Sequence, residues 1–279
     1  MENRVVTIQD ISCLGKCSLT VALPIISAMG VETAVVPTAV LSTHTAFSGF
    51  TFRDLTEDII PIAEHWEKEK IGFDTVYTGY LGSFEQIKIV TEFFDRFKTD
   101  ENIIFVDPAM ADNGVLYTGF TEEFALEMGK LCGKADIIVP NMTEAAFMLG
   151  IPYVEKGYDE EYIRGLLRQL CELGAKKAVI TGISFDDSKL GVMAYDSISN
   201  QFFSYYREQL PVRFHGTGDI FASTCVGAIM NGFSFEETLR IAVGYTVECI
   251  LGTISDKKHN WYGVNFEKAI PYLIRRIGK

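Results

Sequence analysis

His215-Gly216-Thr217-Gly218-Asp219, followed at once by a helix-prone run at residues 220–230, is the stretch on which the interpretation of this sequence rests. The first amides of a helix have no partner within the helix, and together with the helix dipole they bind anions. Glycines let the backbone approach a phosphate without a Cβ in the way. The stretch therefore fits phosphoryl transfer with Asp219 as the base, and it equally fits an ordinary helix capped by Thr217 or Asp219.

Composition limits the classes of protein to which this chain can belong. Its 279 residues are 48% hydrophobic, enough for a substantial core, and no linker or repeat divides them. We therefore expect a single domain over residues 1–279. The net charge of −12 and the lack of a basic stripe argue against a nucleic-acid-binding protein. The sequence has neither a signal-peptide pattern nor a long apolar run, so we expect no membrane association and a cytoplasmic location.

The cysteines favour a reduced environment. None of the six forms a C-x-x-C pair, and most lie within apolar patterns, as buried thiols do. Cys13 and Cys17 as metal ligands are the alternative, which lacks the paired His or Cys partners that a metal site needs.

Short β-rich runs alternate with amphipathic runs along most of the chain. The predicted strands cover residues 5–9, 34–40, 75–78, 103–106, 137–139 and 178–181, and the predicted helices cover residues 21–29, 56–70, 84–97, 122–132 and 160–173. Continuously apolar strands indicate a sheet covered by helices on both faces, which predicts a doubly wound, mainly parallel α/β fold. Residues 190–195 and 201–206 predict an antiparallel hairpin, and two helices follow it, the second opened by Ser234.

Polar side chains follow the predicted strands. A single Asp in such a place more often caps a turn than takes part in catalysis. In open parallel sheets, however, ligands collect at the carboxyl ends of the strands. We expect these residues to line one crevice with the Asp219 loop: Asp10, His44, Thr45, Tyr80, Asp107, Asn141, Glu144 and Thr181.

On these residues the chain resembles the ribokinase superfamily of small-molecule kinases, and within it the pyridoxal and pyridoxamine kinases. The resemblance implies a ribokinase-like fold and ATP-dependent phosphorylation of the 5′-hydroxymethyl group of pyridoxamine, pyridoxal or pyridoxine. The glycine loop indicates the superfamily, and the second and third predicted strands end in motifs that point to the vitamin B6 branch. The matching segments are Leu41-Ser42-Thr43-His44-Thr45, Thr78-Gly79-Tyr80-Leu81-Gly82-Ser83, Asp107-Pro108-Ala109-Met110, Pro140-Asn141-Met142-Thr143-Glu144 and Gly216-Thr217-Gly218-Asp219.

The resemblance also implies roles in phosphoryl transfer. Asp219 is expected to take the proton of the attacking hydroxyl, and the amides of Gly216, Thr217 and Gly218 to form an anion hole. Asp107 and Glu144 are expected to organise Mg²⁺, largely through water, as suits a hard cation that retains its waters. A homodimer and a K⁺ ion are further family expectations. The implied nucleotide-binding residues are Asp107, Asp112, Tyr117, Asn141, Glu144, Thr181 and Thr217, with Asp112 and Tyr117 in a segment similar to the family's flap over ATP.

For the acceptor, the resemblance places Asp10, Thr45 and Tyr80 around the pyridine ring, with His44 nearby. The alternatives are a core aromatic for Tyr80 and a purely structural role for His44. Well-known pyridoxal kinases have a serine where this chain has Asp10, and a carboxylate there favours a cationic ring or aminomethyl group. We therefore expect a preference for pyridoxamine. The segment around Lys16 departs from the family pattern and implies no role for that residue.

Two other functions fit the same residues. A hydroxymethylpyrimidine kinase shares the fold, the loop and the base, and phosphorylates a similar aromatic alcohol. A protein that binds vitamers or nucleotide without catalysis would keep the fold alone, since a fold does not guarantee an activity.

Overall fold

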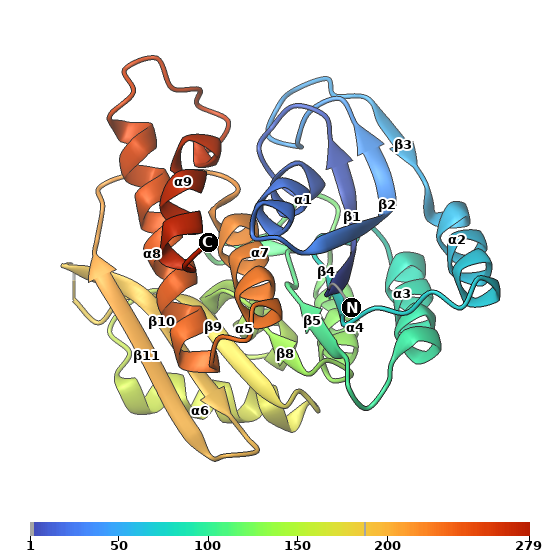
Figure 1. Cartoon of the computed structure of the whole chain (residues 1–279). Coiled ribbons are helices and arrows are strands. Elements are labelled where there is room, and N and C mark those ends of the chain that lie inside the picture. Colours follow the sequence, from blue (N-terminus) through green and yellow to red (C-terminus); the bar gives the residue numbers. More distant parts are fainter. Residues whose placement is uncertain (1–2, 187) are drawn as a thin grey trace. The chain divides into compact units, whose positions relative to one another are not determined.

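The computed structural model describes residues 3–186 and 188–279, and the chain folds into two compact units (Figure 1). The first unit combines Met1–Tyr77 with Leu210–Lys279, and the second is Thr78–Gln209. The chain therefore leaves the first unit and returns to it. The expectation of one domain over residues 1–279 stays a prediction.

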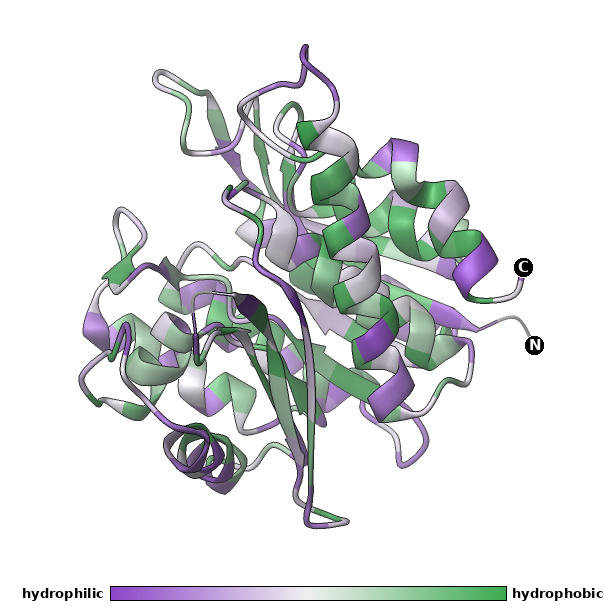
Figure 2. Ribbon diagram, turned by 90° about the vertical axis from the view of Figure 1, so that its left-hand side faces the viewer, coloured by the Kyte–Doolittle hydropathy of each residue, from purple (hydrophilic) through white to green (hydrophobic). Residues whose placement is uncertain are grey.

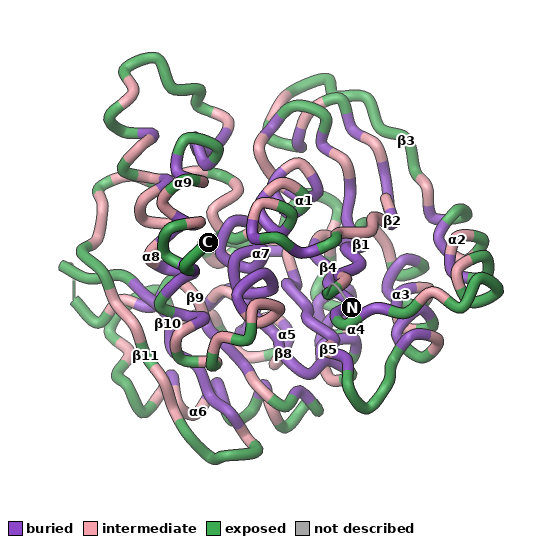
Figure 3. Tube along the Cα trace, viewed as in Figure 1, coloured by how far each residue is buried: buried purple, intermediate pink, exposed green. Residues whose placement is uncertain are grey.

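The strands of the first unit are β1 (Arg4–Ser12), β2 (Glu32–Leu41), β3 (Phe52–Asp54) and β4 (Thr75–Thr78), in the order β4-β1-β2-β3. β1 and β2 run parallel, and β3 adds an antiparallel edge. Figure 3 shows the consequence for burial, because β3 is exposed while β1 is buried along most of its length. A register shift between Gln9 and Ile11 interrupts the pairing of β1 with β2, which then continues to Ser12.

The helices of the first unit are α1 (Leu19–Ala28), α2 (Thr56–Lys68), α7 (Thr217–Met230), α8 (Phe235–Ile254) and α9 (Phe266–Arg276). α1 packs on β1 and β2, and α7 packs on α1. α8 packs on α7, and α9 packs on α8. Their shared core contains the fully buried side chains of Ile25, Ile220 and Tyr245. Ser234 caps α8, as predicted, by accepting a hydrogen bond from the amide of Glu237. This packing joins α7 to α1, although the two helices are far apart in the sequence.

The second unit contains the strands β5 (Ile103–Val106), β8 (Ile137–Ile138), β9 (Lys177–Ile183), β10 (Lys189–Asp196) and β11 (Gln201–Glu208), in the order β11-β10-β9-β8-β5. β5, β8 and β9 are parallel, and β10 and β11 form the predicted antiparallel hairpin, with Asp196 opposite Gln201. A separate two-stranded sheet pairs β6 (Ala111–Asp112) with β7 (Val115–Leu116).

The helices of the second unit are α3 (Phe84–Phe97), α4 (Glu122–Cys132), α5 (Met142–Leu149) and α6 (Glu160–Glu172). Hydroxyl or carboxyl side chains cap α3, α4 and α6 as expected for N-caps, from Ser83, Thr121 and Asp159. The colours of Figure 2 alternate between hydrophobic and hydrophilic residues along the amphipathic helices. α6 packs its buried face on β9 and β10.

The predicted fold class is confirmed: the sheet strands are mainly parallel, helices pack on them, and the hairpin precedes the C-terminal helices. Two positions were wrong. Asp10 lies within β1 instead of after it, because the pairing with β2 resumes beyond the register shift, and Thr181 lies within β9, which pairs with β10 as far as Ile183. In the part of the chain that the structure describes, no helix is both long enough and apolar enough to span a membrane.

Candidate functional site

Helix α7 begins with free amides. Gly216 is the N-cap, with a left-handed φ of 79°, and none of the described side chains caps the helix. The first helical hydrogen bond runs from the amide of Ile220 to the carbonyl of Gly216, at 3.1 Å. The amides of Thr217, Gly218 and Asp219 therefore precede the helical bonds, as anion-binding amides do. The alternative of a helix capped by Thr217 or Asp219 is wrong.

Gly216 also makes a close approach that a side chain would prevent. A Cβ on Gly216 would lie 2.1 Å from the carbonyl oxygen of Lys16. The backbone of the turn between β1 and α1, residues 13–18, thus packs closely against the glycine loop. Both the left-handed φ and this contact require glycine at position 216.

The carboxylate of Asp219 lies in a setting that suits a general base. Asp219 is only half-buried as a residue, but the protein packs closely around its carboxylate. This burial, together with the nearby negative charge of Asp10, raises the pKa of Asp219 to about 7, and hydrogen bonds from the amides of Ser18 and of Asp219 itself oppose the rise. A base with a pKa near neutrality accepts and releases protons readily at physiological pH.

Asp10 is a second buried carboxylate in the same unit. It is 4% exposed, and its Oδ2 accepts a hydrogen bond of 2.9 Å from the Ser12 hydroxyl. Burial raises the pKa of Asp10, while hydrogen bonds from the hydroxyls of Ser18 and Ser12 lower it. Ser18 therefore contacts both carboxylates, with its hydroxyl on Asp10 and its amide on Asp219.

His44 is held as a neutral imidazole. Its Nε2 lies 3.0 Å from the carbonyl of Tyr262, to which it donates, and its Nδ1 accepts from the amide of Ala46 at 3.2 Å. Burial lowers the pKa of His44, which agrees with this assignment. Its ring packs against the rings of Phe47 and His215, with centroids 5.0 and 5.3 Å away. His44 thus has a structural role, while its predicted substrate contact, like that of the exposed Thr45, stays a prediction.

In the second unit, Asn141 and Glu144 form a capping box at the start of α5. The Asn141 side chain accepts from the Glu144 amide at 2.9 Å, and the Glu144 carboxylate accepts from the Asn141 amide at 2.8 Å. The second oxygen of Glu144 accepts from Met110 at 3.2 Å, and the Asn141 side chain donates to Ala111 at 2.8 Å. These bonds attach the segment that enters β6 to α5.

Glu144 fits a metal ion best through a water molecule. Asp107 and Glu144 are both buried, and both carboxylates lie close enough to Cys132 to raise its pKa, although burial of the thiol is the larger cause. Both Glu144 oxygens already accept amide hydrogen bonds, so a water between ion and carboxylate preserves those bonds. Within residues 3–186 and 188–279, no group of three or more His, Cys, Asp or Glu is placed to hold a metal. The Mg²⁺ role stays a prediction.

The segment with Asp112 and Tyr117 forms a small hairpin, β6–β7. Its turn, Asn113-Gly114, has φ values of 52° and 78°, as a type I′ turn requires. The Asp112 carboxylate accepts from the backbone and side chain of Asn113, at 2.9 and 2.8 Å, and the amide of Gly114 donates to Thr143. The Asn-Gly pair is the sequence signal that predicts this hairpin. Tyr117 is 42% exposed.

The remaining predicted residues of the second unit are Tyr80 and Thr181. Tyr80 is half-buried, with its ring centroid 5.5 Å from that of Phe120, so it is not a fully buried core aromatic. The amide of Thr181 donates to the carbonyl of Pro140, and Thr181 forms a parallel bridge with Asn141. The structure thus brings Asn141, Glu144 and Thr181 together.

Asp10, His44 and the Asp219 loop belong to the first unit, and the predicted nucleotide-binding residues other than Thr217 belong to the second. The expectation of one shared crevice stays a prediction. Sequence reasoning missed Ser18, because its contact with Asp219 is made by a backbone amide that no side-chain pattern reveals.

Comparison with known proteins identifies the family. The phosphomethylpyrimidine kinase model matches residues 22–262. A protein of Bacteroides thetaiotaomicron named for the same kinase, in a crystal form with pyridoxal, is 37% identical over 98% of this chain and 96% of its own, with a TM-score of 0.93. Pyridoxal kinase from Lactobacillus plantarum is 29% identical over 98% and 97%, with a TM-score of 0.89. A pyridoxal kinase of Dictyostelium discoideum is 27% identical over 97% of this chain and 90% of its own. The solved structures confirm the ribokinase-like fold, and the chain belongs to the phosphomethylpyrimidine kinase family.

Proposed function

We propose that this protein transfers the γ-phosphoryl group of ATP to the 5′-hydroxymethyl group of a B6 vitamer. The observation that carries the proposal is Asp219, a carboxylate with a pKa raised to about 7 beside the free amides of α7. The relatives support the choice of acceptor, since two are named pyridoxal kinases and a third was crystallised with pyridoxal.

In the proposed reaction Asp219 accepts the proton of the acceptor hydroxyl as the oxygen attacks the γ-phosphorus. The new O–P bond forms while the bond from the γ-phosphorus to the β–γ bridging oxygen breaks, and ADP leaves with that electron pair. The amides of Gly216, Thr217 and Gly218 face the negative charge that develops on the transferred group. Such preorganised amides and the positioning of the hydroxyl supply most of the catalysis.

On the acceptor side, we assign Asp10, Thr45 and Tyr80 to the aromatic ring, with His44 as a neutral neighbour. Asp10 fits a cationic group, because it is buried and the largest contributions that stabilise its charge come from two serine hydroxyls. A substrate ammonium or pyridinium would supply the missing positive charge.

The nucleotide roles belong to the second unit in this proposal. Asn141, Glu144 and Thr181 lie together at the start of α5, and Asp112 and Tyr117 are on or beside the β6–β7 hairpin. Asp107 and Glu144 would hold Mg²⁺ through water, and the bound ion would neutralise phosphate charge. K⁺, a homodimer and a cytoplasmic location stay predictions.

A hydroxymethylpyrimidine kinase is the second candidate, favoured by the family model that matches most of the chain. Incubation with Mg-ATP and pyridoxal, pyridoxine, pyridoxamine or hydroxymethylpyrimidine, followed by mass spectrometry, separates the two. We expect a phosphorylated vitamer, whereas turnover of hydroxymethylpyrimidine alone would select the second candidate. Asp219→Asn should keep acceptor binding and lose turnover, and ligand binding by a wild-type protein without turnover would indicate a non-catalytic binder.

A further inference from the structure

The turn between β1 and α1 has a conformation that side chains rarely adopt. Lys16 has a φ of 53°, and Ser18 combines a φ of 50° with a ψ of −133°. The latter region is populated almost only by glycine, and a residue held there costs about 1–3 kcal/mol. Surrounding contacts must therefore hold the turn in place, and the turn lies beside the proposed base.

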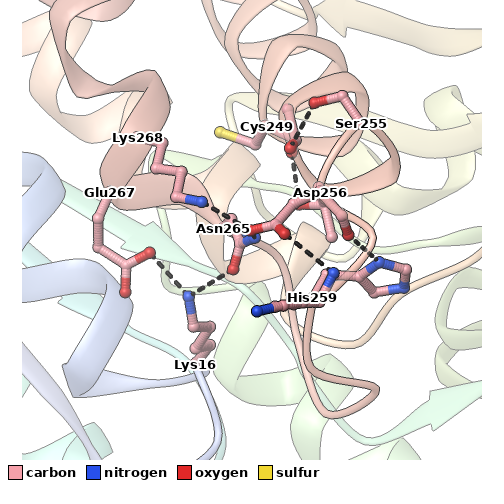
Figure 4. Close-up of polar contacts among 11 residues, drawn as sticks. Lys16, Cys249, Ser255, Asp256, His259, Asn265, Glu267 and Lys268 are labelled. Atoms are coloured by element: carbon pink, nitrogen blue, oxygen red, sulfur yellow. Dashed lines mark hydrogen bonds and ion pairs between the residues drawn. The ribbon is translucent and has the colours of Figure 1, made fainter.

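Lys16 supplies such a contact. Its Nζ lies 2.8 Å from a carboxylate oxygen of Glu267 and 3.2 Å from the side-chain oxygen of Asn265 (Figure 4). Asn265 is itself buried and fixed, because its amide donates to Thr253 on α8 at 2.8 Å. The Lys16 side chain is only 18% exposed. The ion pair therefore attaches the turn to the first residues of α9, a fixed part of the same unit.

The backbone of the same turn shapes the catalytic loop. The carbonyl of Lys16 packs against Gly216, and the amide of Ser18 donates to the Asp219 carboxylate. Rotation of the turn would move both groups, since only Cys17 separates the two residues. The Lys16 ammonium is thus connected to the proposed base through the backbone, without touching a reacting atom.

We propose that Lys16 is a positioning residue for the proposed phosphoryl transfer: its ion pair with Glu267 holds the turn so that the Ser18 amide binds Asp219 and the Lys16 carbonyl seats Gly216. This inference rests on the proposed function. It gives a role to a residue to which the family resemblance assigns none.

The titratable groups that interact with Asp219 are Asp10 on β1 and the Cys17 thiol in the turn. Asp10 in turn interacts with His44, and His44 interacts with His215. The Ser18 amide lowers the pKa of Asp219. Loss of that hydrogen bond should therefore raise the pKa, so that a higher pH is needed to ionise the base.

The test compares Lys16→Met and Glu267→Gln, which break the same ion pair from its two sides, with Lys16→Arg, which preserves it. We expect kcat to fall roughly tenfold in the first two, with the KM of the acceptor nearly unchanged and the acid limb of the kcat profile moved by about half to one pH unit upwards. Lys16→Arg should restore most of kcat and the wild-type profile.

Glu32→Gln is the matched control, because it removes a partly exposed ion pair of 2.8 Å, with Arg4, from the same unit. Its Tm should fall about as much as in Lys16→Met, with kcat and pH profile unchanged. If Lys16→Met lowers the Tm but leaves kcat and the pH profile unchanged, as in the control, the positioning role is wrong. A higher KM for ATP at unchanged kcat would also overturn it, because Lys16 would then bind the nucleotide.

A second readout is independent of the proposed function. In ¹³C-labelled protein, the Asp219 carboxyl signal, assigned by its loss in Asp219→Asn, should titrate at higher pH in Lys16→Met than in wild type. This shift is expected even if no tested alcohol is phosphorylated. An unshifted titration would refute the inference, whereas absent turnover in wild type would refute the proposed function alone.

Discussion

Replacement of Gly216 by alanine tests whether the close contact between the β1–α1 turn and the glycine loop exists. Gly216 has a φ of 79°, and its Cβ would lie 2.1 Å from the Lys16 carbonyl oxygen. Gly232, just after α7, has the same φ of 79°, but no atom of the described residues would lie within 4 Å of its Cβ. The two substitutions therefore share the conformational cost and differ in the contact.

The expected free-energy losses follow from these two terms. A left-handed conformation costs a residue with a Cβ about 1–2 kcal/mol, of which the lower chain entropy of alanine returns roughly 0.4–1 kcal/mol. Gly232→Ala should thus lose about 1 kcal/mol of unfolding free energy. Gly216→Ala must also move the Lys16 backbone, and overpacking of this kind costs about 1–3 kcal/mol more.

The assay is thermal unfolding of both variants, with Gly218→Ala as an opposite control. Gly218 is the second residue of α7 and has open space around its Cβ, so alanine there should stabilise the protein by roughly 0.4–1 kcal/mol through the lower entropy of the unfolded chain. For a chain of this size, each kcal/mol shifts Tm by about 2–4 °C. Equal Tm values for Gly216→Ala and Gly232→Ala would refute the close contact.

Four further predictions concern the carboxylates and α5. The kcat/KM profile should rise with pH through about 7, since Asp219 of the free enzyme must be ionised, and Asp10→Asn should move this limb to lower pH; a limb unmoved by Asp10→Asn would disprove the coupling. The pKa of Asp219 is higher in the folded protein than its ordinary value of 3.8, so the protonated carboxyl group stabilises the folded state. This contribution to the free energy of unfolding is fully present below pH 3.8 and is lost as the pH rises through about 7. Asp219→Asn should therefore raise Tm more at about pH 8 than at about pH 5. Asp10→Ser should lower kcat/KM for pyridoxamine more than for pyridoxal, and equal losses would refute a cation-binding Asp10. Asn141→Ala should cost about 0.5–2 kcal/mol through the lost N-cap, seen as a lower Tm, and an unchanged Tm would contradict the capping box.

Most of the fold was predictable where apolar runs end at strong caps. Residues 75–78 and 103–106 as strands, and 84–97 and 122–132 as helices, match the structure at both ends. For the two helices the reason is local, because Ser83 and Thr121 mark the first turn by their own hydrogen bonds. By contrast, β3 is a three-residue edge strand that pairs with β2 and exposes all its side chains, so no apolar pattern marks it.

From the sequence, only those site residues could be predicted that act through their side chains. Asp219 and Asp10 could be named from the sequence, because each is expected to act through its side-chain carboxylate. Ser18 and Lys16 could not, since one acts through its amide and the other through its carbonyl, and every residue has both groups. The structure reveals their placement through the positive φ values at 16 and 18 and the close approach of the Lys16 carbonyl to Gly216.

The coupling between Asp10 and Asp219 links substrate choice to catalysis. The negative charge of Asp10 raises the pKa of the base, and serine hydroxyls are the largest of the contributions that offset the burial of Asp10 itself. A cationic acceptor bound at Asp10 would cancel that charge and lower the pKa of Asp219, so the substrate would itself ionise the base that activates it. A neutral acceptor would leave the coupling intact. The proposed preference for pyridoxamine should therefore appear as an acid limb at lower pH for kcat than for kcat/KM, because the first reports the complex and the second the free enzyme.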